Sequence, residues 1–459
     1  MLRRLLLSLG LCFFLAAVPA AAQQQLIVRT SPSVGLLGLQ NICLPLLCTV
    51  VRGLDGSQNQ LFLVQPGLLS DLTSLLNTLL GTPGVVAAEP DQILSMPFAP
   101  QYVIPNGLYS TSLMQFYGTT VWTGFVQQPP MQIIRAQDAQ STFRVTGTGQ
   151  VVATIDTGVD PTHPVLAPVL ISGYDFTRNT AGGSELPDAS ACSTTSSSSL
   201  LGGVLSLLGT SSTTSSTCTT SSSAQPYFVQ QQSVAVLDQQ SVAVVDGNGM
   251  ADFGHGTMVA GIIHMVAPTA KIMPLKAFQS NGSGNLSNIL RAVYYAIQNH
   301  ANVINMSFDT KTYSPEFVRA LNAAKNAGII CVAAAGNDGK DELVYPAAIT
   351  SDVMGIASTS DVDAQSSFSN YGTNIVWMAA PGENIVSTYP FGTYAAESGT
   401  SFSAPFVSGT AALLLQVNPK IGQYGASQEM AHAKWISAGM NHGRLDVYQA
   451  LNALIYGVN

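Results

Sequence analysis

From about residue 130 onwards, short apolar segments alternate with longer helical ones, and this alternation limits the fold more than any other feature. The apolar segments have the length of buried strands and span residues 151–155, 272–278, 303–307 and 329–335. Helical stretches separate them, at residues 255–264, 287–300, 315–327 and 401–417. Strands separated by helices predict an α/β fold of three layers, a mostly parallel central sheet with helices on both faces. The last helix is apolar almost all round, which indicates that it is buried.

Polar residues stand where such a fold places its reactive groups, just beyond the carboxyl ends of the strands. The first strand leads into Asp156, and the last leads into Asn337. Two more polar residues, His255 and Ser401, stand at the starts of predicted helices. A helix start supplies free backbone N–H groups and the positive end of the helix dipole. These four residues are therefore the candidates for a reactive site.

Each of these residues is weak evidence by itself. The Asp-Thr-Gly sequence at 156–158 also occurs in aspartic proteases, which need two such loops; this chain has one and would have to dimerise. Asn337-Asp-Gly is by itself more often an ordinary turn. The other histidines are expected to be surface or core residues: His163, His264, His300, His432 and His442. It is the combination, in the order Asp, His, Asn, Ser, that is specific.

Longer motifs around these residues resemble the subtilase family. The matching segments are 152–160, 254–261, 303–307, 333–337 and 399–405. Further matches are 367–372, 380–382 and 443–447. The resemblance covers about residues 130–452 apart from one insertion, and its Asp…His…Ser order is the one that subtilisin uses. It implies a serine endopeptidase that hydrolyses peptide bonds through an acyl-enzyme.

The resemblance also implies a role for each residue. Asp156, His255 and Ser401 would be the catalytic triad, and the Asn337 side chain would stabilise the oxyanion together with the Ser401 backbone N–H. Two segments would pair with an extended substrate as strand edges; they are Ser307, Phe308 and Asp309, and Ala334, Ala335 and Gly336. The alternative is a catalytically inactive subtilase fold that serves as a binding or adhesion module.

The chain departs from the family pattern in a few places. Asp156 and His255 are 99 positions apart (255 − 156), longer than usual, which the insertion explains. Asp309 stands where glycine is usual. By the family match, Asp309 and Asp338 border the primary specificity pocket, where they would favour a Lys or Arg before the scissile bond. Charged loop residues commonly point to solvent, and that reading stays open for both.

The sequence before the sheet divides into a leader, a small domain and a linker. Residues 1–22 have the basic start, apolar stretch and small-residue cleavage site of a signal peptide, and the apolar run is short for a membrane anchor. Residues 26–95 predict a small α+β domain similar to the family's inhibitory propeptide, with a helix at 68–80 capped by Ser70 and ended by Gly81. The stretch for the family's first helix is poor here, since Gly35, Gly38 and Pro45 interrupt it. Residues 96–129 are expected to be a linker and extension.

The catalytic domain is expected at 130–457, with a Ser/Thr-rich insertion at about 183–246. A tandem octapeptide closes the insertion, at 231–238 and 239–246, and its two copies are candidates for the strands of a surface ribbon. A leader followed by an inhibitor-like domain predicts an exported precursor, extracellular or periplasmic, without a membrane anchor. We expect it to mature by removing its own propeptide, which would act as an intramolecular inhibitor.

The cysteines fit an oxidising compartment. We expect disulfides Cys43–Cys48 and Cys192–Cys218, whereas Cys331 lies inside an apolar run and predicts a buried, inert thiol. None of the cysteines forms a zinc pattern.

Net charge and composition limit the classes of partner that the protein is expected to bind. The net charge of −8, with no basic cluster after the first residues, argues against nucleic acid. The expected partners are protein or peptide substrates of a monomer. No cofactor is expected for catalysis. Residues 264–268 contain no Asp, Asn or Glu to act as a calcium ligand, so the sequence does not support structural calcium there, and other calcium sites stay open.

Overall fold

The computed structural model describes residues 24–68, 70–96, 110–192, 235–236 and 251–457. The expected signal peptide and most of the expected insertion lie outside these residues. The described chain forms two compact units. The first contains the residues up to Gly53 together with Asn59–Asp91, and the second contains Leu54–Gln58 and everything from Gln92 onwards.

The first unit is a four-stranded antiparallel sheet with two helices. The strand order is β2-β3-β1-β4, and the strands are β1 (Leu26–Thr30), β2 (Thr49–Gly53), β3 (Leu61–Gln65) and β4 (Val85–Pro90). Helices α1 (Gly35–Leu46) and α2 (Leu72–Leu80) supply Leu39 and Leu79 to a core that also contains Leu26, Val28 and Phe62. Such a small core explains why the strands are rich in Leu, Val and Phe.

The helices of the first unit correct two expectations. The stretch with Gly35, Gly38 and Pro45 does form a helix, because Leu39 and Cys43 are one turn apart and both are buried against the sheet. Helix α2 begins at Leu72, and its cap is Asp71 rather than Ser70: the Ser74 N–H donates to Asp71 Oδ2 at 2.7 Å. Its end at Gly81 is confirmed.

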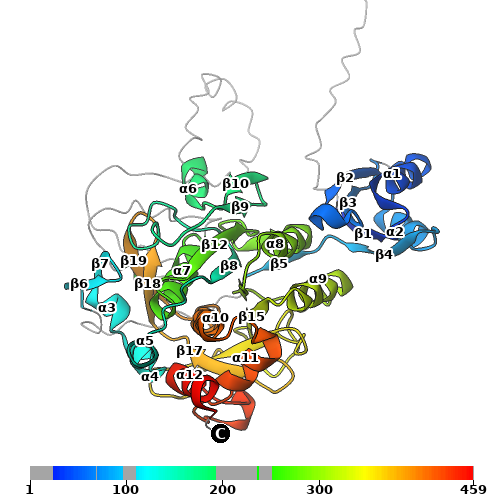
Figure 1. Cartoon of the computed structure of the whole chain (residues 1–459). Helices are drawn as coiled ribbons and strands as arrows, with labels where there is room; N and C mark the ends of the chain where they lie inside the picture. Colours follow the sequence, from blue (N-terminus) through cyan, green and yellow to red (C-terminus); the bar gives the residue numbers. More distant parts are fainter. Residues whose placement is uncertain (1–23, 69, 97–109, 193–234, 237–250, 458–459) are drawn as a thin grey trace, which may run out of the picture. The chain divides into compact units, whose positions relative to one another are not determined.

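The second unit contains the predicted sheet (Figure 1). Eight strands run in the order β10-β9-β12-β8-β14-β15-β16-β17, and every neighbouring pair is parallel except β10 with β9. The four predicted strands are confirmed as β8 (Val151–Asp156), β12 (Lys271–Lys276), β14 (Val303–Met306) and β15 (Ile330–Ala334). The others are β9 (Gly173–Asp175), β10 (Thr180–Gly182), β16 (Met354–Thr359) and β17 (Met378–Pro381).

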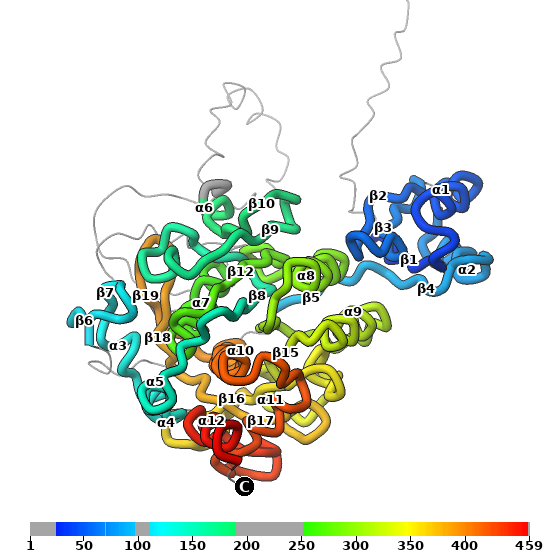
Figure 2. The backbone as a smooth tube through the Cα atoms, in the orientation of Figure 1, coloured from blue at the N-terminus to red at the C-terminus, as the bar shows by residue number. Residues whose placement is uncertain are grey.

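Helices cover the sheet in two groups. Helices α7 (His255–Val266) and α10 (Thr400–Val417) share one core cluster with alternate strand residues such as Val152, Val303 and Val332. Helix α10 runs through the middle of the unit beside β15 and β16 (Figure 2) and is buried on all sides until its last turn, as predicted. Helices α8 (Leu286–Gln298) and α9 (Pro315–Asn326) pack on each other and on β8 and β15, outside that cluster. The side chains of parallel strands alternate between the two faces, so the two groups lie on opposite faces.

Shorter elements complete the unit. Residues of the expected linker and extension form the hairpin β6 (Leu113–Phe116) and β7 (Thr119–Trp122), then α3 (Thr123–Val126) and α4 (Pro129–Ile133). The first octapeptide contributes β11 (Ala235–Val236), which pairs with β19 (Thr393–Glu397). The second copy lies outside the described residues, so the ribbon of the two copies stays a prediction. The remaining elements are β5 (Ile93–Ser95), α5 (Ala136–Phe143), α6 (Leu186–Cys192), β13 (Ser283–Asn285), β18 (Ile385–Tyr389), α11 (Gly422–Met430), α12 (Val447–Tyr456) and the short turns Gly56–Gln58 and Ala438–Met440.

The cysteine predictions are tested in part. The Cys43–Cys48 disulfide is present. Cys331 is a free, fully buried thiol, and burial raises its pKa to about 12, so it is inert at neutral pH. The side chains of Cys192 and Cys218 lie outside the described residues, and their disulfide stays a prediction.

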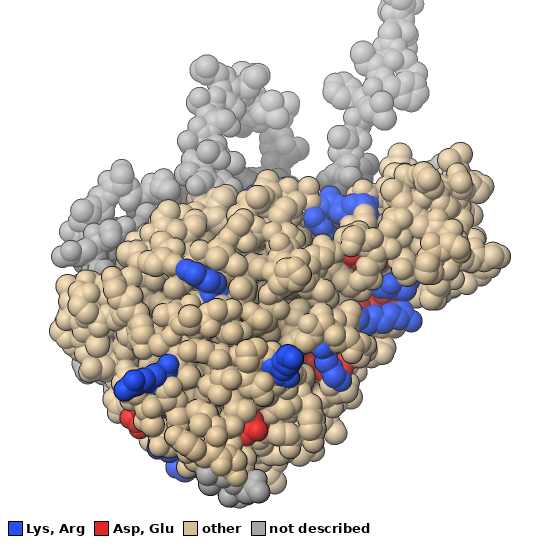
Figure 3. Space-filling view, viewed as in Figure 1, with Lys and Arg blue, Asp and Glu red and all other residues tan. Residues whose placement is uncertain are grey.

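Charged side chains are sparse on the surface. Figure 3 shows a face on which isolated Lys, Arg, Asp and Glu residues are separated by wide uncharged areas, in keeping with a charged fraction of 9%. Within the described ranges, no helix is long and apolar enough to cross a membrane.

The buried position of α10 makes a testable prediction about stability. Leu413→Ala should lower the free energy of unfolding by about 2–5 kcal/mol, because Leu413 is fully buried in α10 and the truncation leaves a cavity. The matched control is Leu113→Ala, where the side chain is 68% exposed and the effect should stay within about 0.5 kcal/mol. Denaturant midpoints of the three chains give the comparison; equal midpoints would mean that α10 is not part of the core.

Candidate active site

The structure brings Asp156 and His255 together. Asp156 is the last residue of β8 and His255 the first of α7, and the His255 Nδ1 lies 2.8 Å from Asp156 Oδ1. A carboxylate can only accept, so Nδ1 carries the proton, and in the neutral ring Nε2 is the acceptor. Both side chains are buried, with His255 5% exposed. The contact spans 99 positions of sequence and is therefore made entirely by the tertiary structure.

The backbone before His255 requires a glycine. Gly254 has a φ of +92°, a conformation that favours glycine. A Cβ at this position would lie 2.2 Å from the Tyr389 ring. The chain therefore enters α7 through a turn that only glycine can make, and this turn fixes where the His255 side chain starts.

Three carboxylates act on the His255 ring. Burial by itself lowers the pKa of His255, but the charge and hydrogen bond of Asp156, followed by the charges of Glu397 and Asp252, outweigh burial and raise that pKa to about 9. Asp252 is three residues before His255, and Glu397 ends β19. Burial raises the pKa of Asp252 in turn to about 6. The site thus favours a positive charge on the imidazole.

Ser401 lies in the first turn of α10 and is held by Ser307, the residue that follows β14. Its hydroxyl donates to the Ser307 carbonyl at 3.0 Å, and the Ser307 hydroxyl donates back to the Ser401 carbonyl at 2.7 Å. Asn305 Nδ2 donates to the Ser307 hydroxyl at 2.9 Å. The Ser401 side chain is buried at a helix N-terminus, where backbone N–H groups and the helix dipole stabilise a developing negative charge.

Asn337 is oriented by the residue before Ser401. The Thr400 N–H and hydroxyl both donate to Asn337 Oδ1, at 2.9 and 2.8 Å. A backbone N–H can only donate, so the side-chain oxygen must face Thr400 and the NH₂ group is the opposite end of the amide. Gly399, with its φ of +155°, lets the two segments approach: a Cβ there would lie 3.3 Å from Asn337 Nδ2.

A strand already lies along one of the predicted substrate edges. Within the second unit, β5 pairs antiparallel with β13, and Ser95 forms a bridge with Asp309. The Met96 N–H donates to the Gly282 carbonyl at 3.0 Å and extends this pairing. The chain segment from Ile93 to Met96 therefore occupies the position of an added strand between two backbone edges.

The other predicted edge residues lie differently. Phe308 is fully buried and packs its ring against Phe278 and Phe317, so its side chain belongs to the core. Ala334 pairs with Ile356 of the central sheet. Ala335 and Gly336 continue from β15 toward Asn337, and no bridge between them and β5 is found in the described part of the chain.

The two aspartates of the expected specificity pocket have different surroundings. Asp338 is exposed and pairs with Lys311 at 3.0 Å; Lys311 also pairs with Glu342 at 2.8 Å. Asp309 is partly buried, and its Oδ2 lies 2.5 Å from the position a Cβ would take on Gly336. Burial, reinforced by the Asp338 charge and opposed by Lys311, raises the pKa of Asp309 to about 7.

Sequence reasoning missed several residues of this site. Strand β13 had no signal beyond the Gly-Ser-Gly of residues 282–284. Asp252 and Glu397 carry no motif, although an acidic residue three positions before His255 was visible. As for metals, no cluster of three or more His, Cys, Asp or Glu side chains suited to an ion occurs among the residues described.

Comparison with known proteins places these residues in a family. The family model described as the subtilase family matches residues 147–448. A thermophilic serine proteinase of Bacillus sp. (strain AK1) is 32% identical over 66% of this chain and 62% of its own length. Subtilisin Savinase of Lederbergia lenta is 38% identical over 38% of this chain and 65% of its own length. The chain thus spans less than two thirds of the length of these relatives.

A solved structure shows the same fold. Fervidolysin of Fervidobacterium pennivorans, a keratinolytic enzyme related to subtilisin, superposes with a TM-score of 0.64. The match covers 94% of this chain and 61% of that one at 20% identity.

The electrostatics of His255 can be measured directly. Asp252→Asn and Glu397→Gln should each lower the pKa of the His255 ring from about 9 toward the ordinary value of about 6.5, because each removes a negative charge that favours the imidazolium. NMR titration of the ring protons gives the pKa. Asp446→Asn, at the cap of α12, is the control and should leave it unchanged. An unaltered pKa in both test variants would contradict the assignment.

Proposed function

This chain belongs to the subtilase family, and on that premise we propose that it is a serine endopeptidase that hydrolyses peptide bonds through an acyl-enzyme. The observation that carries the proposal is the buried pair of Asp156 and His255, whose Nε2 can accept a proton when the ring is neutral, in a chain that also sets Ser401 at the start of a buried helix. A nucleophile, a base and a group that orients the base are the parts that acyl transfer requires.

In the reaction, Ser401 would attack the scissile carbonyl. Its hydroxyl rests on the Ser307 carbonyl and must turn toward His255 Nε2, which takes the proton; catalytic hydrogen bonds often tighten only when substrate binds. Asp156 holds the tautomer and stabilises the imidazolium that forms. His255 then gives the proton to the leaving amine, and water releases the acyl group by the reverse sequence.

Asn337 would stabilise the oxyanion. Thr400 holds its amide oxygen, which leaves Nδ2 as the donating end, and the Ser401 backbone N–H is the second donor. A donor fixed before the reaction costs no reorganisation when charge develops; removing one such donor costs about 10²–10³ in rate.

The substrate would bind as an extended strand. The pairing of residues 93–96 with β13 and Asp309 supports this, because any peptide backbone can make the same hydrogen bonds. This segment follows directly on the first compact unit. We infer that residues 26–95 are an inhibitory propeptide whose end occupies the substrate position until it is cleaved, and that the chain is exported as a precursor.

The nucleophile is tested by a pair of neighbouring serines. Ser401→Ala should abolish peptide hydrolysis and fluorophosphonate labelling, and the exported protein should accumulate as a precursor that starts near residue 23. Ser403→Ala is the matched control: Ser403 is two residues further along α10, and its buried hydroxyl has no hydrogen-bond partner within the described structure. The expression host must lack related proteases. Normal maturation of the Ser401→Ala chain there would refute self-cleavage.

Asp309 makes a second prediction, about specificity. Because Lys311 already neutralises Asp338, we infer that Asp309 is the carboxylate available to a basic substrate residue. It is neutral below its pKa of about 7 and negative above it. The preference for Lys over Leu before the scissile bond should therefore grow as the pH rises through about 7.

The ratio of kcat/KM for paired Lys and Leu peptides measures this preference, since both peptides share the His255 ionisation. Asp309→Asn should remove the pH dependence of the ratio, whereas Asp338→Asn should retain it. A ratio that stays flat with pH in the unmodified enzyme would eliminate the role of Asp309.

A further inference from the structure

A fully buried carboxylate outside the Asp–His–Ser set lies beneath the start of α7. Glu185 is 0% exposed and lies in the segment that leads into α6. Its Oε2 accepts from the Gly254 N–H at 2.7 Å and from the Thr157 hydroxyl at 3.3 Å, and its Oε1 accepts from the Thr257 hydroxyl. Thr157 and Thr257 are themselves fully buried.

These contacts cap the helix that carries His255. Helices often begin with a capping box, in which a Glu three residues into the helix accepts the N–H of the cap residue. Here the cap is Gly254, which has no side chain, and the third residue is Thr257. Glu185 supplies the missing carboxylate from a segment 69 positions away. The Thr157 hydroxyl accepts the next free donor, the Gly256 N–H, at 3.0 Å.

The same contacts fix the segment that carries Asp156. The Thr157 N–H donates to Asp156 Oδ1 at 2.7 Å, the same oxygen that contacts His255. Glu185 therefore bonds on one side to the residue after Asp156 and on the other to the residue before His255. The two halves of the Asp–His pair share one anchor.

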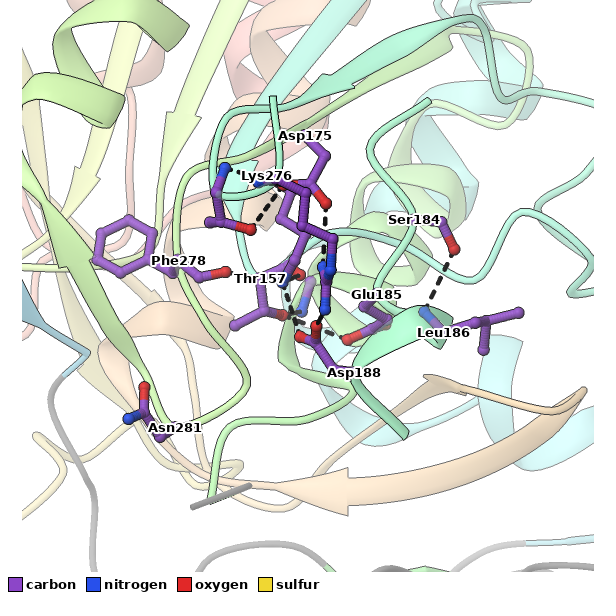
Figure 4. Close-up of polar contacts among 12 residues, drawn as sticks. Thr157, Asp175, Ser184, Glu185, Leu186, Asp188, Lys276, Phe278 and Asn281 are labelled. Atoms are coloured by element: carbon purple, nitrogen blue, oxygen red, sulfur yellow. Dashed lines mark hydrogen bonds and ion pairs between the residues drawn. The ribbon is translucent and has the colours of Figure 1, made fainter. Parts of the chain in front are cut away.

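A buried lysine completes the network. Lys276 ends β12 opposite Asp156 and is 0% exposed. Its Nζ donates to the Thr157 carbonyl at 2.6 Å, to Asp188 Oδ2 at 2.8 Å and to the Phe278 carbonyl at 2.8 Å. Figure 4 shows Lys276, Glu185 and Asp188 gathered around Thr157.

Charge balance keeps this network in place. Burial raises the pKa of the Glu185 carboxyl, whereas the hydrogen bonds from Thr257 and Gly254 and the charge of Lys276 act against that rise. Asp188 pairs with both Lys276 and Arg178. A buried charge is tolerated only where partners satisfy it, and here both signs are present.

We propose that Glu185 is a positioning residue of the active site, which sets the geometry of Asp156 and His255 by holding the start of α7 against Thr157. The effect of Glu185 on catalysis rests on the proposed function, whereas its effect on the geometry of Asp156 and His255 does not. Glu185 touches neither substrate nor the reacting atoms, and it acts through the His255 backbone. The residues expected to bind substrate are not part of this network, so loss of the Glu185 carboxylate should lower kcat rather than raise KM.

Glu185→Gln tests the proposal with almost no change of shape. The Gly254 N–H and the Thr257 hydroxyl use different oxygens of Glu185, so a glutamine that keeps the Gly254 N–H on its amide oxygen turns its NH₂ group toward the Thr257 hydroxyl. That hydroxyl already accepts from the Asp160 N–H and would have to reverse its direction to accept a second hydrogen. We expect kcat to fall on the order of 10- to 100-fold with KM unchanged, because a misplacement of about 1 Å can cost about 10²-fold. Glu316→Gln is the control: Glu316 is as buried and pairs with Arg319 in α9. This control should keep kcat.

A second measurement is independent of activity. In the Ser401→Ala chain, the proton between His255 Nδ1 and Asp156 should give a low-field NMR signal, which Glu185→Gln should shift or broaden and Glu316→Gln should not. An unchanged signal, or an active Glu185→Gln enzyme with the kcat of the parent, would overturn the proposal. An inactive parent enzyme would overturn the proposed function alone, and the NMR signal would then decide on Glu185. If the Glu185→Gln chain does not fold, Thr257→Val, which removes one donor to Glu185, is measured in the same two ways.

Discussion

The hydrogen bond between Asp156 and His255 is the contact on which the rest of the site depends. It joins the end of a central strand to the start of a buried helix, so the sheet and the helix must pack in one register for it to form. Its low exposure makes the contact electrostatically strong. Burial also makes the contact necessary for folding, because a buried carboxylate without a partner would cost several kcal/mol of stability. Gly254 and the Glu185 network serve this single requirement.

Several of the few charged side chains in this protein are clustered in its interior, near His255. The chain has few charged residues, yet Asp156, Glu185, Asp252 and Lys276 are all buried around the start of α7. Buried ionisable groups cost free energy unless they are paired and hydrogen-bonded. Shifted pKa values are common where a protein tunes acid–base groups. His255, whose pKa is raised to about 9, is the group on which the charges of Asp156 and Asp252 act, together with that of Glu397.

Ser401 and Asn337 are held in place by hydrogen bonds between neutral groups. Ser401 of α10 and Ser307, the residue after β14, exchange hydrogen bonds, and Thr400 at the start of α10 orients Asn337. These are hydrogen bonds between neutral groups in a buried setting, strong enough to orient side chains. Charged groups thus surround His255, whereas hydrogen bonds between neutral groups hold Ser401 and Asn337. The two halves meet through the packing of α7 against α10 and through the pairing of β8 with β14.

The sequence by itself determined the parallel sheet, its four central strands, the buried helix α10 and the candidate residues Asp156, His255, Asn337 and Ser401. Local patterns sufficed there, because apolar periodicity and the residues that end a strand or begin a helix are encoded within a few positions. The tertiary structure alone decided α1, which forms through burial of Leu39 and Cys43 despite its glycines and proline. It alone also brought β13, Glu397 and Glu185 to the site, whereas Asp252 lies only three positions before His255. Glu185 is 69 positions from the Gly254 N–H that it accepts, and a contact at that separation leaves no periodic trace in the sequence, since only the packing of the sheet against α7 brings the two together.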